Sequence, residues 1–220
     1  MIRFPNELTA LQQWICWRLE PDPKGGRDNK TPYCAHSGKK ASSTNPETWT
    51  DCATALAVKE KYSYAGVGFV FAKGGGIVGV DIDHCLNPAT GEPNQIAADI
   101  LAMLPPTYIE VSPSGTGLHI FLKGEMPDGG CRNTKTGVEM YGHARYFTMT
   151  GKRYTNSADT IAVDDGALQR IHAKFIRPAK KRDQRKRTAS TPLSDEELLQ
   201  KARQSGTGEN FVLLWDGKWK

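Results

Sequence analysis

The sequence of 220 residues lacks any long apolar run. No stretch approaches the roughly 18 to 20 consecutive apolar residues that a helix needs to cross a bilayer. The N-terminal segment also lacks the uninterrupted apolar stretch of a secretory signal. We therefore expect a soluble cytoplasmic protein with no membrane partner. The length allows one generous domain, or one domain and the start of another.

Paired cysteines are missing as well. The five cysteines are odd in number and widely spaced, and no two form a CxxC motif, so no disulfide framework is indicated. Cys34 with His36, or His84 with Cys85, offers side chains of the zinc-ligand type, but neither has the second clustered pair of a structural zinc site. We expect dispersed thiols in the core of a protein from a reducing compartment.

Outside one segment the sequence has little excess charge. Lys and Arg number 29 against 24 Asp and Glu, a formal net charge of +5. Residues 177–187 hold seven basic residues and one acidic residue, so this basic segment carries +6 and the rest of the chain −1. Such a run is either a solvated linker or a phosphate-binding strap. Its candidate DNA-binding residues are Lys180, Lys181, Arg182, Arg185, Lys186 and Arg187.

Short strands dominate the pattern before the basic segment. The strands at 66–72 and 77–83 are joined by the glycine-rich residues 73–76, which predicts a hairpin. Most other connections are equally short, which indicates an α+β fold with a largely antiparallel sheet. Further strands are expected at WICWRLE, from residue 14, and at 107–112, 118–124, 136–142 and 145–151.

Cap residues mark the expected helices. Asn45 and Pro46 predict a helix that begins with Asn45 as its cap and Pro46 at the first helical position. After the basic segment, Ser194 and Glu197 form a capping box. One helix and an aromatic-rich end cannot bury a core, so we expect the chain to end inside a larger protein. Two further helices are expected at 94–104 and near 167–175.

The sharpest feature is a pair of acidic residues in the strand at 77–83. Side chains alternate along a strand, so Asp81 and Asp83 share one face while Val80 and Ile82 share the other. Two neighbouring carboxylates on an apolar strand repel each other and lose hydration. A divalent cation such as Mg²⁺ between them relieves both penalties. A solvated strand end gives the same pattern, and the pair alone does not decide.

A glycine-rich turn, SPSGTG at 112–117, precedes a strand that carries His119 and Lys123 on one face. Backbone N–H groups and hydroxyls of such a turn can meet phosphate oxygens, and a histidine and a lysine beside it suit a triphosphate. An ordinary hairpin loop with a surface histidine has the same sequence pattern. The candidate nucleotide-binding residues are Ser114, Gly115, Thr116, Gly117 and His119.

The strand at 136–142 offers a third carboxylate. Glu139 and Tyr141 share one face of it, opposite Val138 and Met140. Glu139 would join the other acids only if the strands are neighbours. Arg145 begins the next strand, where it could pair either with a phosphate or with Glu139.

Together these motifs resemble those of the archaeo-eukaryotic primase superfamily, in particular the phage- and plasmid-type bifunctional primase-polymerase domains. VGVDIDHC matches the family's DxD strand, SPSGTGLHIF its glycine-rich histidine motif, and VEMYGHARYFTMTG its strand with a final acid. The resemblance covers about residues 10–175. Upstream, Trp14, Trp17, KTPY at 30–33, Asn45-Pro46 and Trp49 echo the family's pattern.

The resemblance implies a template-dependent nucleotidyltransferase of phage or plasmid DNA replication, located in the bacterial host cytoplasm, that makes primers and extends DNA. Asp81, Asp83 and Glu139 would be catalytic and would hold Mg²⁺ or Mn²⁺. His119 would hold the triphosphate with Ser114 and residues 115–117, and Arg145 and Lys30 are further candidates for phosphate contacts. The expected partners are a single-stranded DNA template, a primer or initiating nucleotide, and a dNTP or NTP.

The family's fold would be two fused α/β parts, the second with a mostly antiparallel sheet like that of an RNA-recognition motif, and a catalytic cleft between them. Residues 1–176 would form the catalytic domain, 177–192 a basic linker, and 193–220 the start of a helical primase C-terminal region. A helicase domain commonly follows in the family and would be missing from this chain.

Two other functions fit parts of the pattern. A non-catalytic module that binds single-stranded nucleic acid would use aromatic side chains and the basic segment, but three clustered acids repel nucleic acid unless a metal intervenes. A rolling-circle initiator endonuclease needs two histidines that flank one apolar strand residue. In the expected strands the only histidine is His119, which Ile120 and Phe121 follow.

Overall fold

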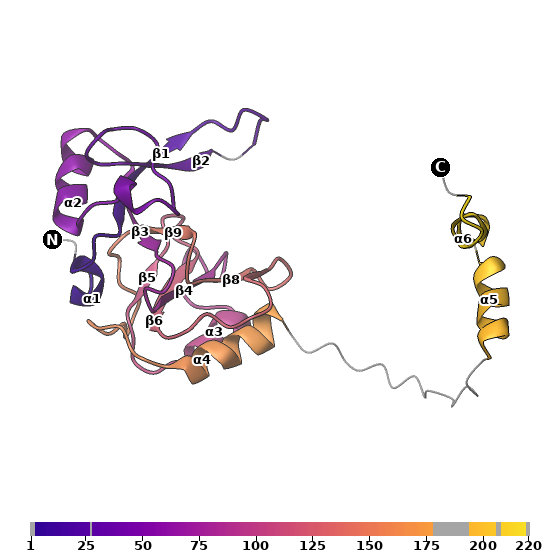
Figure 1. Cartoon of the computed structure of the whole chain (residues 1–220). Helices are drawn as coiled ribbons and strands as arrows, with labels where there is room; N and C mark the ends of the chain where they lie inside the picture. The colour runs from indigo at the N-terminus through magenta and orange to yellow at the C-terminus, as the bar shows by residue number, and fades with distance from the viewer. Residues whose placement is uncertain (1–2, 27, 178–193, 206–207, 219–220) are drawn as a thin grey trace. The chain divides into compact units, whose positions relative to one another are not determined.

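The first of two sheets contains the strands in the order β2-β1-β3-β9 (Figure 1). The computed structural model describes residues 3–26, 28–177, 194–205 and 208–218. In the first sheet, each strand is antiparallel to its neighbours. The bounds are Trp14–Glu20 for β1, Asn29–Tyr33 for β2, Gly66–Phe71 for β3 and Arg145–Met149 for β9.

The second sheet has the order β5-β6-β4-β8-β7, again with antiparallel neighbours. The predicted α+β class with largely antiparallel pairing is therefore confirmed. The likeness of this sheet to an RNA-recognition motif stays a prediction. The bounds are Ile109–Val111 for β5, Leu118–Lys123 for β6, Ile77–Ile82 for β4, Val138–Tyr141 for β8 and Arg132–Asn133 for β7.

The hairpin expected between 66–72 and 77–83 is wrong, because β3 and β4 lie in different sheets. Both edges of β3 are occupied by β1 and β9, and both edges of β4 by β6 and β8. The glycine-rich residues 73–76 carry the chain from one sheet to the other, with Gly74 and Gly76 at φ values of +74° and +67°.

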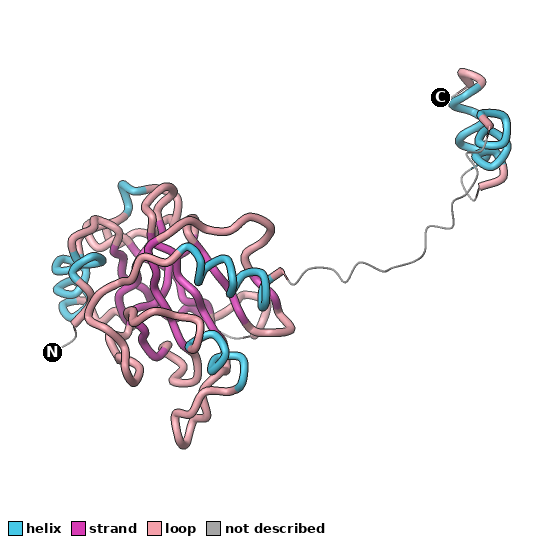
Figure 2. The backbone as a smooth tube through the Cα atoms, turned by 90° about the horizontal axis from the view of Figure 1, so that it is seen from below, coloured by secondary structure: helices cyan, strands magenta, loops and turns pink. Residues whose placement is uncertain are grey.

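Within residues 1–179, helices lie against the strands of the two sheets (Figure 2). The helix expected to begin at Asn45 is also wrong, because Asn45 caps only the 3₁₀ turn η1, Pro46–Thr48. Extended backbone at Trp49 ends that turn, and Asp51 then caps α2. The remaining bounds are Asn6–Thr9 for α1, Cys52–Lys61 for α2, Gln95–Leu101 for α3, Asp165–Ile171 for α4 and His172–Ile176 for the π-helical turn η2.

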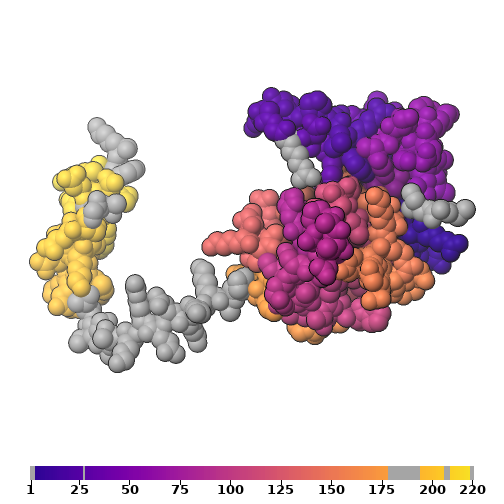
Figure 3. All heavy atoms as spheres, turned by 180° about the vertical axis from the view of Figure 1, so that it is seen from behind, coloured from indigo at the N-terminus to yellow at the C-terminus, as the bar shows by residue number. Residues whose placement is uncertain are grey.

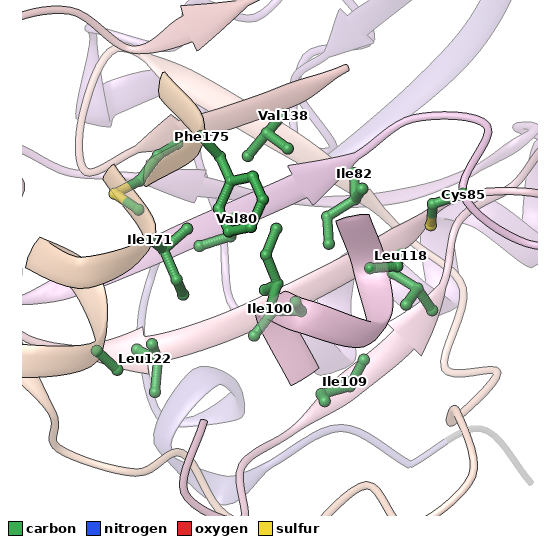
Figure 4. Close-up of a cluster of buried hydrophobic side chains, with 14 of the residues drawn as sticks. Val80, Ile82, Cys85, Ile100, Ile109, Leu118, Leu122, Val138, Ile171 and Phe175 are labelled. Atoms are coloured by element: carbon green, nitrogen blue, oxygen red, sulfur yellow. The ribbon is translucent and has the colours of Figure 1, made fainter. Parts of the chain in front are cut away.

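One face of the second sheet is apolar and packs against α3, α4 and η2. Figure 4 shows Val80, Ile82, Leu118 and Val138 from the strands among the side chains of these helices. This face uses the alternate residues of β4, β6 and β8, as the strand periodicity predicts. The residues between them point to the opposite face, where the functional candidates lie.

Aromatic side chains join the two sheets. Phe71 and Phe147 from the first sheet pack on Phe121 from the second, with ring centroids 6.1 and 5.9 Å away. Gly79 on β4 makes this approach possible, because a Cβ atom there would lie 2.3 Å from Phe71 Cζ. In Figure 3 most of the indigo and purple residues lie together at the top of the domain, and most of the magenta to orange residues lie below them.

The chain divides into two compact units, residues 1–179 and 180–220. In the second unit the structure describes α5, Asp195–Arg203, and α6, Gly208–Trp215. The expected capping box is present, because the Ser194 hydroxyl accepts from the Glu197 N–H and the Glu197 carboxylate accepts from the Ser194 N–H. Throughout the described residues, no helix is both long and apolar enough to span a membrane.

Candidate active site

Four ionisable residues form a row across four strands of the second sheet. The pairing register places Glu110 on β5 opposite His119 on β6, His119 opposite Asp81 on β4, and Asp81 opposite Glu139 on β8. Residues directly opposite in antiparallel strands point to the same face, with Cβ atoms about 4.5–5.5 Å apart. The strands thus gather three predicted site residues, which are separated by up to 58 positions in the chain, into one line.

Asp81 lies at the centre of this row and is poorly solvated. Its side chain is 18% exposed, and its Oδ1 atom is buried without a hydrogen-bond partner among the described residues. The pKa of this carboxyl is raised to about 6, mainly by burial; the charges of Asp83 and Glu139 also raise it, and those of His119 and Lys30 lower it. A buried carboxylate oxygen without a donor is the kind of atom that a metal ion satisfies.

Asp83 follows directly after β4, and its side chain is exposed. Its backbone N–H donates to the Gly137 carbonyl at 2.9 Å, which holds the end of β4 against the residues that lead into β8. Since Asp83 is two residues beyond Asp81, both carboxylates lie on the same side of the strand. One carboxylate is therefore half-buried and the other open to solvent.

His119 is buried at 4% exposure and held on two sides. Its ring stacks on Phe147 of the first sheet, with centroids 4.8 Å apart. Its Nε2 atom lies 3.8 Å from Asp81 Oδ1, and its Nδ1 atom lies 3.3 Å from Glu110 Oε1. The surface histidine that an ordinary hairpin would carry is thus not what the structure shows.

The glycine-rich turn folds onto the segment that follows Asp83. The Thr116 carbonyl accepts from the N–H groups of Cys85 and Leu86 at 2.7 and 2.9 Å. Gly115 has φ +78°, which favours glycine. The Ser114 hydroxyl contacts those of Ser112 and Thr116 at 3.0 and 3.2 Å, so the hydroxyls of the turn are clustered beside the acidic strand.

A cleft of about 540 Å³ opens over this face. Its second wall comes from the first sheet. Lys30 on β2 has its Nζ atom 3.5 Å from Thr148 Oγ1, and Arg145 begins β9. Of the predicted site residues, the cleft is lined by Asp81, Asp83, Ser114, His119, Lys30 and Arg145.

Glu139 is placed differently from the other two acids. Neither Glu139 nor any of residues 115–117 is among the described residues that line the cleft. The Tyr141 hydroxyl donates to Glu139 Oε2 at 2.7 Å, and Arg145 Nη2 lies 3.6 Å from the same oxygen. The alternative in which Arg145 pairs with Glu139 therefore matches this structure.

No three histidine, cysteine, aspartate or glutamate side chains converge closely enough to hold a metal ion in the part of the chain that the structure describes. Asp81, Asp83 and Glu139 share a face without forming a finished coordination set. All five cysteines are free thiols. The predicted DNA-binding residues Lys180, Lys181, Arg182, Arg185, Lys186 and Arg187 lie outside the described residues.

The prediction missed Glu110, which is fully buried beside His119. A signal was present, because Glu110 is the one charged residue in the apolar strand around Ile109 and Val111. Tyr146 and Thr148 were missed too, and both line the cleft. They alternate with Arg145 and Phe147 along β9, and only the sheet order shows that this strand faces the acidic row.

Comparison with known proteins supports a primase-polymerase family for the chain. Over 161 residues it is 36% identical to the DNA primase-polymerase of Nitratiruptor phage NrS-1. The matched segment is 71% of this chain and 21% of that protein, so the chain spans about a fifth of the relative's length. No protein-family model matches the sequence.

Proposed function

We propose that this chain contains the catalytic part of a template-dependent nucleotidyltransferase that synthesises primers and extends DNA from dNTPs or NTPs, in the manner of the archaeo-eukaryotic primases. The observation that carries the proposal is the Asp81 Oδ1 atom, which is buried without a hydrogen-bond partner among the described residues and lies beside Asp83 and His119 in one cleft. The similarity to a phage DNA primase-polymerase supports it.

The donor set fits a hard divalent cation. Asp81, Asp83 and Glu139 contribute only oxygen ligands, which Mg²⁺ and Mn²⁺ accept. Asp81 and Asp83 would hold the metal from the cleft wall, and Glu139 from the neighbouring strand. The bound metal would activate a 3′-hydroxyl and neutralise the charge of the triphosphate and the leaving pyrophosphate.

The protein's own groups would position the nucleotide. His119 and the hydroxyl of Ser114 lie on one wall of the cleft, and Lys30 and Arg145 on the other. Donors and cations on both walls suit a polyphosphate, because phosphoryl transfer depends on positioning and charge stabilisation rather than on a protein nucleophile. The proposed partners are a single-stranded DNA template and a primer or initiating nucleotide. A helicase domain would belong to a longer protein that contains this chain.

The alternative functions fit this site less well. A rolling-circle endonuclease requires a histidine pair on a strand, and among the described residues His119 is the only histidine in a strand. A non-catalytic binding module gives no reason to hold the Asp81 carboxylate in a place where burial raises its pKa to about 6.

Incorporation of labelled nucleotide on a single-stranded DNA template, with Mg²⁺ or Mn²⁺, tests the proposal. We expect wild-type protein to extend a supplied primer, and Asp81→Ala and Asp83→Ala to lose this activity. Asp128→Ala is the matched control, because it removes one exposed carboxylate outside the cleft lining. Undiminished synthesis in both cleft variants would overturn the site assignment.

A further inference from the structure

The row of residues across the second sheet begins with a carboxylate that does not reach the cleft. Glu110 is 0% exposed, and it is not among the described residues that line the cleft. A buried carboxylate is costly unless donors surround it. Both oxygens of the Glu110 carboxylate have hydrogen-bond donors inside the protein, and these donors offset the cost of burying it.

Three hydrogen-bond donors and the ring of His119 converge on Glu110. Its Oε2 atom accepts from the Tyr108 hydroxyl at 2.8 Å and from the Gly151 N–H at 2.9 Å. Its Oε1 atom accepts from the Thr150 N–H at 3.1 Å and faces His119 Nδ1 at 3.3 Å. Three of these partners are ordinary structural donors. The fourth is a ring whose other nitrogen faces the proposed reaction site.

The contact determines which way the His119 ring presents its nitrogens. An ionised carboxylate only accepts hydrogen bonds, so Nδ1 must carry the proton that points to Glu110. With Nδ1 held there and the ring stacked on Phe147 at 4.8 Å, Nε2 is directed towards Asp81 and the cleft. Glu110 and Phe147 approach the ring from different sheets, so rotation of the ring would break one contact or the other.

We propose that Glu110 is a positioning residue that acts through His119: it fixes the ring by Nδ1 so that Nε2–H, as the second donor of the ring, faces the triphosphate oxygens of the incoming nucleotide. The inference rests on the proposed function and adds a buried residue that the sequence motifs did not point to. In metal sites, a histidine that binds through one nitrogen is commonly oriented by a carboxylate on the other, and loss of that carboxylate typically costs about 10–100-fold in metal affinity or activity. We expect a loss of the same kind for a histidine that binds a nucleotide.

A purely structural role is the alternative, because Thr150 and Gly151 follow β9 and Glu110 thereby ties the two sheets together. Tyr108 separates the two roles. Its hydroxyl donates to Oε2 of the same carboxylate, whereas His119 faces Oε1, and the Tyr108 side chain is buried at 1% exposure. Tyr108→Phe removes one support of Glu110 and leaves the Glu110–His119 contact intact.

Steady-state primer extension by the full chain provides the kinetic test. We expect Glu110→Leu, which fills the space without an acceptor, to raise the nucleotide KM about tenfold, with little change in kcat or in DNA affinity. Glu110→Gln keeps one acceptor for Nδ1–H and should recover part of the loss. Tyr108→Phe should leave the nucleotide KM unchanged while lowering the melting temperature.

A double-mutant cycle completes that test. If Glu110 acts only through His119, Glu110→Leu should add nothing to His119→Ala, because the two substitutions remove one interaction. The proposal would be overturned if the KM increases of Glu110→Leu and His119→Ala multiplied in the double variant. It would also be overturned by a wild-type KM in Glu110→Leu, or by an equal rise in KM for Tyr108→Phe.

A second measurement does not depend on catalysis. NMR of ¹⁵N-histidine-labelled protein should show a protonated, slowly exchanging Nδ1 for His119 that is lost in Glu110→Leu and kept in Tyr108→Phe. An unprotonated Nδ1 in the wild-type protein would overturn the inference even if Glu110→Leu fails to fold. A protonated Nδ1 in a protein without polymerase activity would instead show that the positioning is right and the proposed function wrong.

Discussion

Asp81 on β4 lies directly opposite Glu139 on β8, so two carboxylates face the same side of adjacent strands. Like charges in this position destabilise a sheet, and burial adds to the penalty at Asp81. The arrangement makes physical sense if a cation joins the two strands' carboxylates when the protein works.

In metal-free buffer, Asp81→Asn should be more stable than the wild-type protein at pH 7. Folding raises the pKa of Asp81 from 3.8 to about 6, so the folded state binds more protons than the unfolded state between these values. Stability should therefore fall as the pH rises from about 4 to 6 and stay low above that range. Urea unfolding at pH 7 should show a gain of about 1–3 kcal/mol for Asp81→Asn.

The same comparison has an internal control. At pH 4 the gain should disappear, because Asp81 is then largely neutral in the wild-type protein too. Addition of Mg²⁺ or Mn²⁺ at pH 7 should stabilise the wild-type protein and not the variant, because a ligand stabilises the state that binds it. A variant that is less stable than wild type in EDTA at pH 7 would contradict the account of Asp81.

His119→Ala should raise the nucleotide KM or lower kcat while leaving DNA binding nearly intact. The reason is that His119 lies on the cleft wall beside Asp81, on the opposite side from Lys30. Primer-extension kinetics and fluorescence anisotropy on single-stranded DNA measure the two properties separately. An equal loss of DNA binding would make His119 a template or structural residue.

Gly79→Ala should destabilise the protein by about 1–3 kcal/mol, as overpacked cores do. An added Cβ atom would lie 2.3 Å from Phe71 and 2.5 Å from Phe147, both of which join the sheets. Gly166→Ala is a suitable control, because the nearest atom there is the end of the flexible Arg170 side chain at 3.0 Å. Equal melting temperatures for Gly79→Ala and wild type would contradict the packing described here.

Neutralising the basic residues of 177–187 tests whether that segment binds DNA. If all seven contacted single-stranded phosphates, log K would fall with log salt at a slope of roughly −5. Replacement of these seven residues by glutamine should then flatten the slope. Replacement of Lys59 and Lys61 on α2 by glutamine should leave the slope almost unchanged. A slope that is unaffected by the basic segment would make the segment a linker only.

Strand periodicity was enough to predict the faces of the second sheet. Alternation placed Asp81 with Asp83 and Glu139 with Tyr141, and the structure shows these faces. Periodicity is a local property, so it does not say which strands are neighbours. The position of Glu139 beside Asp81 depends on pairing between β4 and β8, which only the folded chain reveals.

The wrong expectations have the same origin. Residues 73–76 carry ordinary hairpin signals, yet β3 and β4 lie in different sheets, where other strands occupy both edges of each. Asn45 and Pro46 form a true helix start, but the turn ends at Thr48 and Asp51 provides the cap of α2. Glu110 is unusual in sequence as the one acid of a short apolar strand, but its link to the site depends on His119, which only the strand pairing places opposite it.

Single-nucleotide incorporation on four primed templates, which differ only in the first template base, shows whether Asp81 serves a template-dependent polymerase. We predict that wild-type protein adds the complementary nucleotide alone and that EDTA or Asp81→Asn abolishes the addition, although the variant is the more stable protein in metal-free buffer. Incorporation that ignores the template base, or that continues undiminished in Asp81→Asn, would contradict the account.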